Sequence, residues 1–309
     1  MTDRDRNLSK AMDALFNEHG YRGKIVSIEH VKELETEIMT RYQKGLLDSD
    51  LYDAYLASFD FACQQKLTDA RSLIIITIPQ PQIQVTFLRQ NKSYPVVIPP
   101  TYYSAVDNDV ADFLKAVFEP QGYQLQNVRL PEKLLAVRSG LARYGKNNIT
   151  YVKGMGSFQR PLVFISDYPC EQDSWGEATV LEHCENCSAC MKACPTDAIV
   201  SDRFQIYAQR CLTFHNEASK PFPQWLSASW HNCLVGCMIC QKACPANKDV
   251  VQWIEAGGTF DNEETDLILS GVSKKRLPQE TLEKIKKLDM MRHYDVLRRN
   301  LKALIQKSR

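Results

Sequence analysis

The chain has 309 residues, a formal net charge of +1, a hydrophobic content of 44% and a charged content of 24%. These values are those of an ordinary folded protein, and the nearly neutral charge excludes a general electrostatic attraction to nucleic acid. The charged N-terminal segment has no apolar signal region, and no window reaches the length of about eighteen apolar residues needed to span a membrane. We therefore expect a cytoplasmic protein with more than one domain.

The first part of the chain predicts helices mixed with strands. Helices are expected at 8–16, after Ser27, at 51–61, after Asp107 and from Pro131 to Gly140, and strands at 24–28, 72–78, 82–88, 94–98 and 162–165. Ser27 and Asp107 are the predicted N-caps of their helices. The two strands at 82–98 are predicted to form a hairpin. This mixture favours an α+β fold with a mixed sheet over a regular βαβ repeat.

Nine of the eleven cysteines lie between Cys184 and Cys244. The first motif has the spacing C-x2-C-x2-C-x3-C-P of bacterial ferredoxins, in which the fourth cysteine ligates the other of two clusters. A second motif, C-x2-C-x3-C-P, begins at Cys237. The spacing predicts two [4Fe–4S] clusters, one held by Cys184, Cys187, Cys190 and Cys244, the other by Cys194, Cys237, Cys240 and one more thiolate. Cys211 and Cys233 are both candidates for that place, and spacing does not choose between them.

Zinc and disulfides are the alternative explanations of the same cysteines. Zinc ribbons use paired C-x2-C motifs and need neither a third close cysteine nor the trailing prolines Pro195 and Pro245. Disulfides require an oxidising compartment, which the absence of an export signal does not favour. His183, His215 and His231 flank the cysteines and are candidates to tune a cluster through hydrogen bonds, although a satisfied or surface histidine is the default.

The C-terminal segment is basic. We expect a helix at 247–258 and an acidic turn at 261–266. From Lys274 to Arg309 the chain has twelve Lys or Arg and four Asp or Glu, a net charge of about +8. Its apolar residues recur at helical spacing. This pattern fits either two packing helices with solvated lysines, which we favour, or a basic surface for RNA or an acidic protein.

Two stretches resemble the epoxyqueuosine reductases, cobalamin-dependent iron–sulfur enzymes of queuosine tRNA maturation that are related to reductive dehalogenases. One is 131–147, whose arginine, glycine-leucine and glycine-lysine-asparagine residues are similar to the family's segment beside the corrinoid. The other is the cysteine module together with Arg210-Cys211, because the family uses a lone cysteine between its two motifs as a ligand. The resemblance therefore favours Cys211 over Cys233. The candidate cofactor-binding residues are Arg138, Gly140, Leu141, Tyr144, Gly145, Lys146 and Asn147.

The resemblance implies three parts and a direction of electron flow. Residues 1–175 would form a nitroreductase-like α/β domain that binds cobalamin, 176–252 a ferredoxin-like module with two [4Fe–4S] clusters, and 253–309 basic helices. Electrons would pass from a donor such as ferredoxin or flavodoxin through the clusters to cobalt. The predicted activity is that of an oxidoreductase of queuosine biosynthesis and tRNA processing, with tRNA as a candidate partner.

The sequence departs from the family at the proton donor. The family's aspartate would fall near Gln126, where this chain has no carboxylate. Tyr102, Tyr103, Asp107 and Glu132 are the candidate replacements, and the substrate is left open. Two rival functions keep the cysteine module: an electron carrier or corrinoid-protein activator without a small-molecule substrate, and a flavin-binding version of the N-terminal domain.

Overall fold

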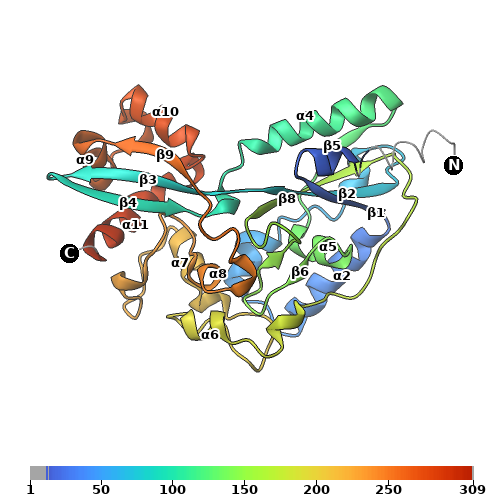
Figure 1. Ribbon diagram of the computed structural model, residues 1–309, viewed down its shortest axis with the longest axis horizontal. Helices are drawn as coiled ribbons and strands as arrows, with labels where there is room; N and C mark the ends of the chain where they lie inside the picture. Colours follow the sequence, from blue (N-terminus) through green and yellow to red (C-terminus); the bar gives the residue numbers. More distant parts are fainter. Residues whose placement is uncertain (1–11, 13, 308–309) are drawn as a thin grey trace. The chain divides into compact units, whose positions relative to one another are not determined.

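The protein is described from a computed structural model, which covers residue 12 and residues 14–307 (Figure 1). The chain forms two compact units, Met1–Pro79 with Val106–Cys187, and Gln80–Ala105 with Ser188–Arg309. A segment from the first third of the sequence therefore belongs to the unit that contains the C-terminus. Within the expected helix at 8–16, residue 12 and residues 14–16 are helical, and Leu8 lies outside the described residues.

The first unit is built on a four-stranded antiparallel sheet with the order β1-β2-β8-β5. The strands are β1 (Arg22–Ser27), β2 (Ser72–Pro79), β5 (Leu125–Asn127) and β8 (Gln159–Ser166). β2 is fully buried from Ser72 to Ile78, as its continuous apolar run predicts for a strand covered on both faces. A two-stranded ladder joins β6 (Arg143–Tyr144) to β7 (Thr150–Tyr151).

Helices cover both faces of this sheet. α4 (Val106–Phe118) packs Val110, Leu114 and Phe118 against alternate residues of β2. α2 (His30–Gln43) and α5 (Glu132–Arg138) lie on the opposite side in Figure 1, and α5 contacts β2 and β8. The short α3 (Ser49–Leu51) continues into a π-helical turn at Tyr52–Leu56, so the helix predicted at 51–61 is only partly present.

Two predicted N-caps are wrong. α2 begins after Glu29, and the Ser27 hydroxyl accepts from the Glu29 amide in a turn before the helix. Asp107 lies inside the first turn of α4, where its carboxylate binds Arg160. The Asp107 carboxylate is bound by a distant arginine, and the Ser27 hydroxyl is used in a local turn, so neither side chain caps a helix.

The second unit contains the predicted hairpin. β3 (Gln82–Arg89) pairs with β4 (Lys92–Ile98) through a turn in which Gln90 and Asn91 have φ of 51° and 59°. β9 (Ile254–Phe260) lies parallel to β3 on its other side. The helix predicted at 247–258 is therefore wrong, since pairing with β3 overrides the local pattern. A Cβ on Gly257 would lie 2.5 Å from the Ile83 side chain, so this close strand contact requires glycine.

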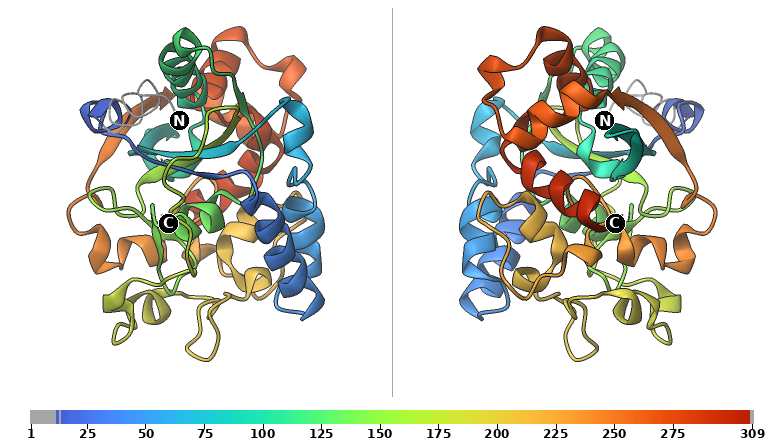
Figure 2. Two further views of the ribbon diagram at one scale, coloured as in Figure 1. Left: turned by 90° about the vertical axis from the view of Figure 1, so that its right-hand side faces the viewer. Right: turned by 90° about the vertical axis from the view of Figure 1, so that its left-hand side faces the viewer.

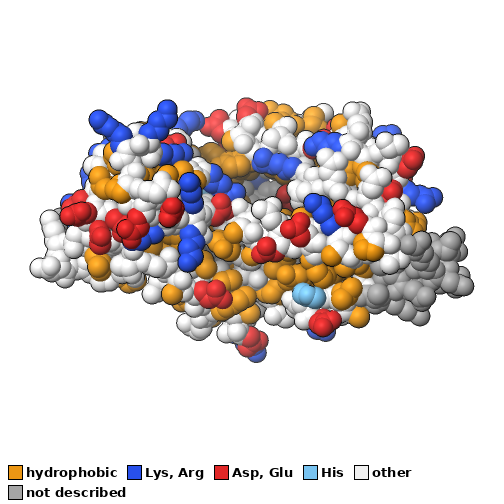
Figure 3. Space-filling view, turned by 90° about the horizontal axis from the view of Figure 1, so that it is seen from above, with side chains coloured by type: hydrophobic (Ala, Val, Ile, Leu, Met, Phe, Trp, Pro, Cys, Tyr) orange, Lys and Arg blue, Asp and Glu red, His pale blue; other side chains and the backbone are white. Residues whose placement is uncertain are grey.

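Six helices complete this unit: α6 (Ala189–Ala193), α7 (Leu212–Glu217), α8 (Ile239–Lys242), α9 (Asn262–Ser270), α10 (Gln279–Lys287) and α11 (Tyr294–Lys307). The acidic segment at 261–266 is the start of α9, because Asp261 and Glu264 form a capping box. The apolar faces of α10 and α11 are buried with the hairpin in one core, so the predicted pair of packing helices is confirmed. Figure 2 shows the two helices, in red, beside the teal strands of the hairpin. Lysine and arginine side chains stand out at the left of Figure 3, over the part of the chain that contains α10.

Candidate metal centre

Each of the two cysteine motifs contains one short helix. Cys190 lies on α6 and Cys240 on α8, and these helices pack against each other. Cys194 and Cys244 follow the ends of the helices in extended conformation, directly before Pro195 and Pro245. Because a proline cannot continue a helix, each motif ends with its last cysteine turned out of the helical path. Cys184 and Cys187 belong to the first compact unit, and the remaining cysteines of the motifs belong to the second.

Three thiols of the second unit lie within electrostatic reach of one another. Burial raises the pKa of Cys237 to about 11, and the charges of Cys211 and Cys194 contribute. Burial also raises the pKa of Cys211, with the charge of Cys194 contributing. Unpaired thiolates so close together repel, whereas iron coordination would neutralise them. Thiolates are the soft ligands that iron–sulfur clusters use.

Cys233 has a different environment from Cys211. Its side chain is completely buried, and its Sγ donates to Oδ1 of Asn232 at 3.1 Å. Burial raises its pKa far above the ordinary value, which disfavours the thiolate. All eleven cysteines fall in the described residues, and none of them forms a disulfide. Across residues 12 and 14–307, no three His, Cys, Asp or Glu side chains form a group suited to a metal ion.

The candidate proton donors have distinct surroundings. In the second unit, the Tyr102 hydroxyl donates to Glu217, and burial, with the nearby Glu217 charge, raises the pKa of Tyr102 well above 10. Tyr103 is half-buried. In the first unit, Asp107 forms a bidentate pair with Arg160, with both N–O distances 2.5 Å. Asp107 is thus held as an ion-pair partner.

Glu132 is the candidate carboxyl group whose pKa is raised. It is the first residue of α5, and burial raises its pKa despite nearby cationic groups that lower it. A carboxyl whose pKa is raised keeps its proton at higher pH, which is what proton donation requires. Gln126, the position at which the resemblance would place an aspartate, is exposed on β5.

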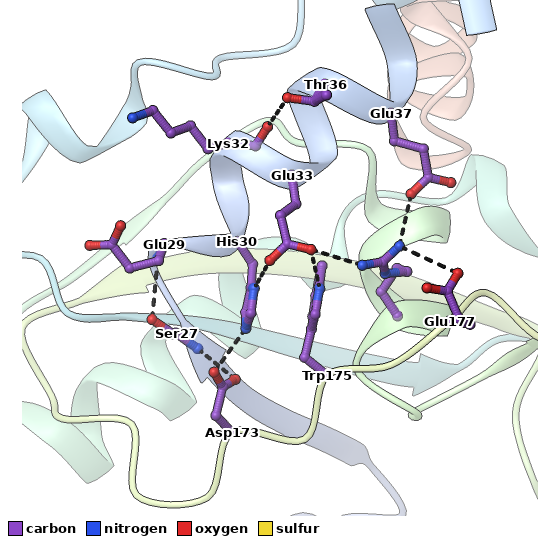
Figure 4. A network of polar contacts seen from close by, with 11 residues as sticks. Ser27, Glu29, His30, Lys32, Glu33, Thr36, Glu37, Asp173, Trp175 and Glu177 are labelled. Atoms are coloured by element: carbon purple, nitrogen blue, oxygen red, sulfur yellow. Dashed lines mark hydrogen bonds and ion pairs between the residues drawn. The ribbon is translucent and has the colours of Figure 1, made fainter. Parts of the chain in front are cut away.

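Arg138 is engaged by carboxylates of α2. Its Nη2 lies 2.9 Å from Glu33, and its Nη1 lies 3.2 Å from Glu37. Its guanidinium also lies 5.0 Å from the centre of the Trp175 ring. Figure 4 shows Glu33 between His30 and Trp175, which donate to its two carboxylate oxygens. Arg138 therefore holds the loop that carries Trp175 against α2.

The remaining residues of the cofactor segment are mostly occupied by internal contacts. Lys146 donates to the backbone oxygens of Glu185 and Cys187, at 3.1 and 3.3 Å. Asn147 is buried and donates to the Tyr151 hydroxyl at 2.9 Å. Tyr144 is buried as well, and a Cβ on Gly145 would lie 2.6 Å from Asn147. Lys146 thus supports the loop of the first two motif cysteines.

Gly140 and Leu141 differ from these residues because they line a pocket of about 240 Å³ in the first unit. Gly140 has a φ of 74°, and a Cβ there would meet no other atom within 4 Å. The pocket is also lined by Arg22, Lys24 and Lys153. Its volume lies below the roughly 300–1,000 Å³ of ordinary ligand pockets, so it is too small by itself for a corrinoid.

Sequence reasoning missed the side chains that support these candidates. They are Glu33, Glu37 and Trp175 around Arg138, Glu217 beside Tyr102, and Asn232 between two cysteines. Of these residues, Asn232 alone has a sequence position that indicates its role, because it directly precedes Cys233. The others lie far along the chain from the residues they contact.

The comparisons with known proteins agree with the cysteine pattern. The family profile of the 4Fe-4S double cluster binding domain matches residues 183–247. The epoxyqueuosine reductase of Cyclobacterium marinum is 30% identical over 153 residues, which are 48% of each protein. That of Bacillus subtilis is 31% identical over 139 residues, 44% of this chain and 35% of the relative. The chain thus aligns with about half, or less, of the length of these curated relatives.

Solved structures show the same fold over nearly the whole chain. The structure of epoxyqueuosine reductase from Streptococcus thermophilus has a TM-score of 0.67 and 17% identity, covering 98% of this chain and 82% of that one. A crystal structure of epoxyqueuosine reductase with an epoxyqueuosine-modified tRNA stem loop has a TM-score of 0.66 and 18% identity, covering 97% and 82%. Among the described residues, no helix is long and apolar enough to cross a membrane. The predicted resemblance is thus confirmed as similarity: the chain is similar in sequence to epoxyqueuosine reductases over about half of its length, shares their fold, and matches the 4Fe-4S double cluster binding domain at residues 183–247.

Proposed function

We propose that the chain is a cytoplasmic, cobalamin-dependent oxidoreductase similar to epoxyqueuosine reductase. Two [4Fe–4S] clusters would pass electrons from a donor such as ferredoxin or flavodoxin to cobalt. One cluster would be held by Cys184, Cys187, Cys190 and Cys244, the other by Cys194, Cys211, Cys237 and Cys240. The observation that carries the proposal is the match of residues 183–247 to the 4Fe-4S double cluster binding domain.

The choice of Cys211 as a ligand rests on its neighbours. The Cys211 thiol is influenced by the charge of Cys194, a member of the same ligand set. The Cys233 thiol instead donates to an amide oxygen in a fully buried site. A thiol that donates a hydrogen bond to a neutral oxygen in a buried site keeps its proton, whereas a cluster ligand must be a thiolate. Cys233 is therefore better explained as a structural residue.

The segment at 138–147 is the proposed cobalamin-binding region. Bound cobalamin would supply a cobalt centre that accepts and delivers single electrons. Gly140 and Leu141 are the candidates for contact with one part of the cofactor only, because their pocket is too small for a whole corrinoid but a glycine without neighbouring atoms lets a flat group approach the backbone. Arg138, Tyr144, Gly145, Lys146 and Asn147 would shape the region through their internal contacts.

The proposed substrate class is modified tRNA. A relative of the same fold was crystallised with an epoxyqueuosine-modified tRNA stem loop, and the exposed lysines and arginines of α10 and α11 could contact a phosphate backbone. Because no carboxylate occupies the expected position near Gln126, we assign the proton to Glu132, whose pKa burial raises. Tyr102, Tyr103 and Asp107 are the alternatives.

The test is metal analysis and an ultraviolet–visible spectrum of protein purified anaerobically from cells supplied with cobalamin. About eight irons and one cobalt per chain are expected. Turnover of epoxyqueuosine-containing tRNA would then be measured. Eight irons without cobalt or flavin would contradict the reductase and favour an electron carrier that serves a protein partner. Bound flavin without cobalt would favour a flavin-dependent reductase.

A further inference from the structure

Asn232 makes four polar contacts at the start of the second cysteine motif. Its Nδ2 donates to the Trp230 oxygen at 3.1 Å and to Sγ of Cys237 at 3.2 Å. Its Oδ1 accepts from the Met238 amide at 2.8 Å and from Sγ of Cys233 at 3.1 Å. One side chain therefore spans the turn from Trp230 to Met238.

The contacts fix which end of the amide faces Cys237. A backbone N–H only donates, so the Met238 amide must meet the oxygen of Asn232. A backbone carbonyl only accepts, so the Trp230 oxygen must meet the nitrogen. The second N–H of that nitrogen is then left to point at Cys237. Gly236, with a φ of 65°, allows the tight turn that brings Cys237 back to this amide.

We propose that Asn232 is a positioning residue that raises the reduction potential of the cluster held by Cys194, Cys211, Cys237 and Cys240. This inference rests on the proposed function, because it requires that cluster. Reduction adds one electron to the cluster and makes its sulfur ligands more negative. An N–H donor stabilises this reduced form more than the oxidised form, and hydrogen bonds to the sulfurs are among the factors that set cluster potentials.

The experiment is an anaerobic redox titration, monitored by electron paramagnetic resonance, of the chain with both clusters loaded. Asn232→Asp keeps an oxygen for the Met238 amide but replaces the donor with a negatively charged acceptor. We expect one of the two midpoint potentials to fall by at least about 59 mV, a tenfold change in a one-electron equilibrium. Asn232→Ala should lower the same potential by less. The other cluster is the internal reference.

Cys233→Ala is the matched control. It removes the partner of the Asn232 oxygen but leaves the N–H contact to Cys237, so both potentials should stay as in the wild type. Unchanged potentials in the loaded Asn232 variants, or an equal fall of both, would overturn the inference. A wild-type chain without two [4Fe–4S] signals would overturn the proposed function instead.

A measurement on the wild-type protein covers the case in which the variants lose their clusters. With ¹⁵N in the side-chain amides of asparagine, electron spin echo envelope modulation should detect a coupling between one reduced cluster and an asparagine nitrogen. No such coupling to either cluster would overturn the inference. The modulation pattern does not depend on turnover of any substrate.

Discussion

Nη2 of Arg138 lies 2.9 Å from Oε2 of Glu33. An arginine that the resemblance makes a candidate for cofactor binding is thus bound to a carboxylate of α2. The same Glu33 oxygen accepts from the Trp175 indole at 3.0 Å. His30 stacks on Trp175, with ring centres 4.0 Å apart, and contacts both Glu33 and Asp173. The arrangement in Figure 4 fastens the loop at 173–177 to α2. Any effect of Arg138 on a cofactor would then act through this loop.

Replacement of Arg138 by glutamine should loosen that loop. The Arg138 side chain is only 14% exposed, and the change removes the cation that Glu33 and Glu37 share, although Glu37 keeps its pair with Arg41 and Glu33 its contact with His30. We expect the free energy of unfolding to fall by about 1–3 kcal/mol, with faster proteolysis near Trp175. Urea unfolding and limited proteolysis measure these effects.

Arg143→Gln is the matched control for this change. Its pair with Glu182 is exposed on both sides, at 49% and 85%, so we expect no measurable change in the free energy of unfolding. Equal stability of the two variants would show that the Arg138 network does not hold the loop.

Removal of Cys211 should lower the metal content, whereas removal of Cys233 should leave it unchanged. Cys211→Ala is expected to reduce the iron from about eight to about four per chain, because one [4Fe–4S] cluster loses a ligand. Cys233→Ala should keep about eight irons and lose stability only, because it removes a buried side chain. Iron analysis and electron paramagnetic resonance decide between them. The reverse result would make Cys233 the ligand.

Glu132→Gln should slow proton transfer without unfolding the protein. Glutamine resembles the protonated carboxyl that burial favours at this position, but it cannot release a proton. We expect turnover of the substrate to fall by roughly 10²- to 10⁴-fold, with a stability change within about 1 kcal/mol. The measurement is the rate and its pH profile.

Tyr102→Phe is the comparison for this prediction. It leaves the Glu217 carboxylate without the Tyr102 hydroxyl, so a loss of about 1–3 kcal/mol in stability is expected with little change in the chemical step. A large loss of turnover in Tyr102→Phe, with full turnover in Glu132→Gln, would assign the proton to the tyrosine.

His231 should make stability depend on pH. Its side chain is 1% exposed, and burial, with Arg299 and Lys307 nearby, lowers its pKa from 6.5 to about 4. Between these values the unfolded chain binds a proton that the folded chain does not, so stability falls as the pH falls. From pH 7.5 to 5.5 the loss should be about 1 kcal/mol.

Urea unfolding of the anaerobic, cluster-loaded protein at several pH values measures this slope. His231→Leu should remove the His231 contribution. His19→Gln, at an exposed position, should leave the slope as in the wild type. If His231→Leu has the full wild-type slope, another group must be responsible.

The sequence predicted those features that depend on local spacing. The alternation at 82–98 gave the hairpin, the buried run gave β2, and the proline and glycine at 131 and 140 gave the limits of α5. The cysteine motifs predicted the double cluster binding domain for a similar reason, because ligands two or three residues apart reach a cluster through local backbone geometry alone. None of these features needs a partner from elsewhere in the chain.

Contacts between distant segments decided the rest. The local sequence at 254–260 predicts a helix, but the segment forms a strand that pairs with β3. Backbone hydrogen bonds to an existing strand outweigh a weak local preference for helix. Asp107 could cap a helix, but Arg160 lies 53 residues away in sequence and binds it. The contacts of Arg138 with Glu33 and of Tyr102 with Glu217 are similarly non-local. Spacing along the chain specifies which residues can share a motif, whereas only the folded structure decides which charges and polar groups meet.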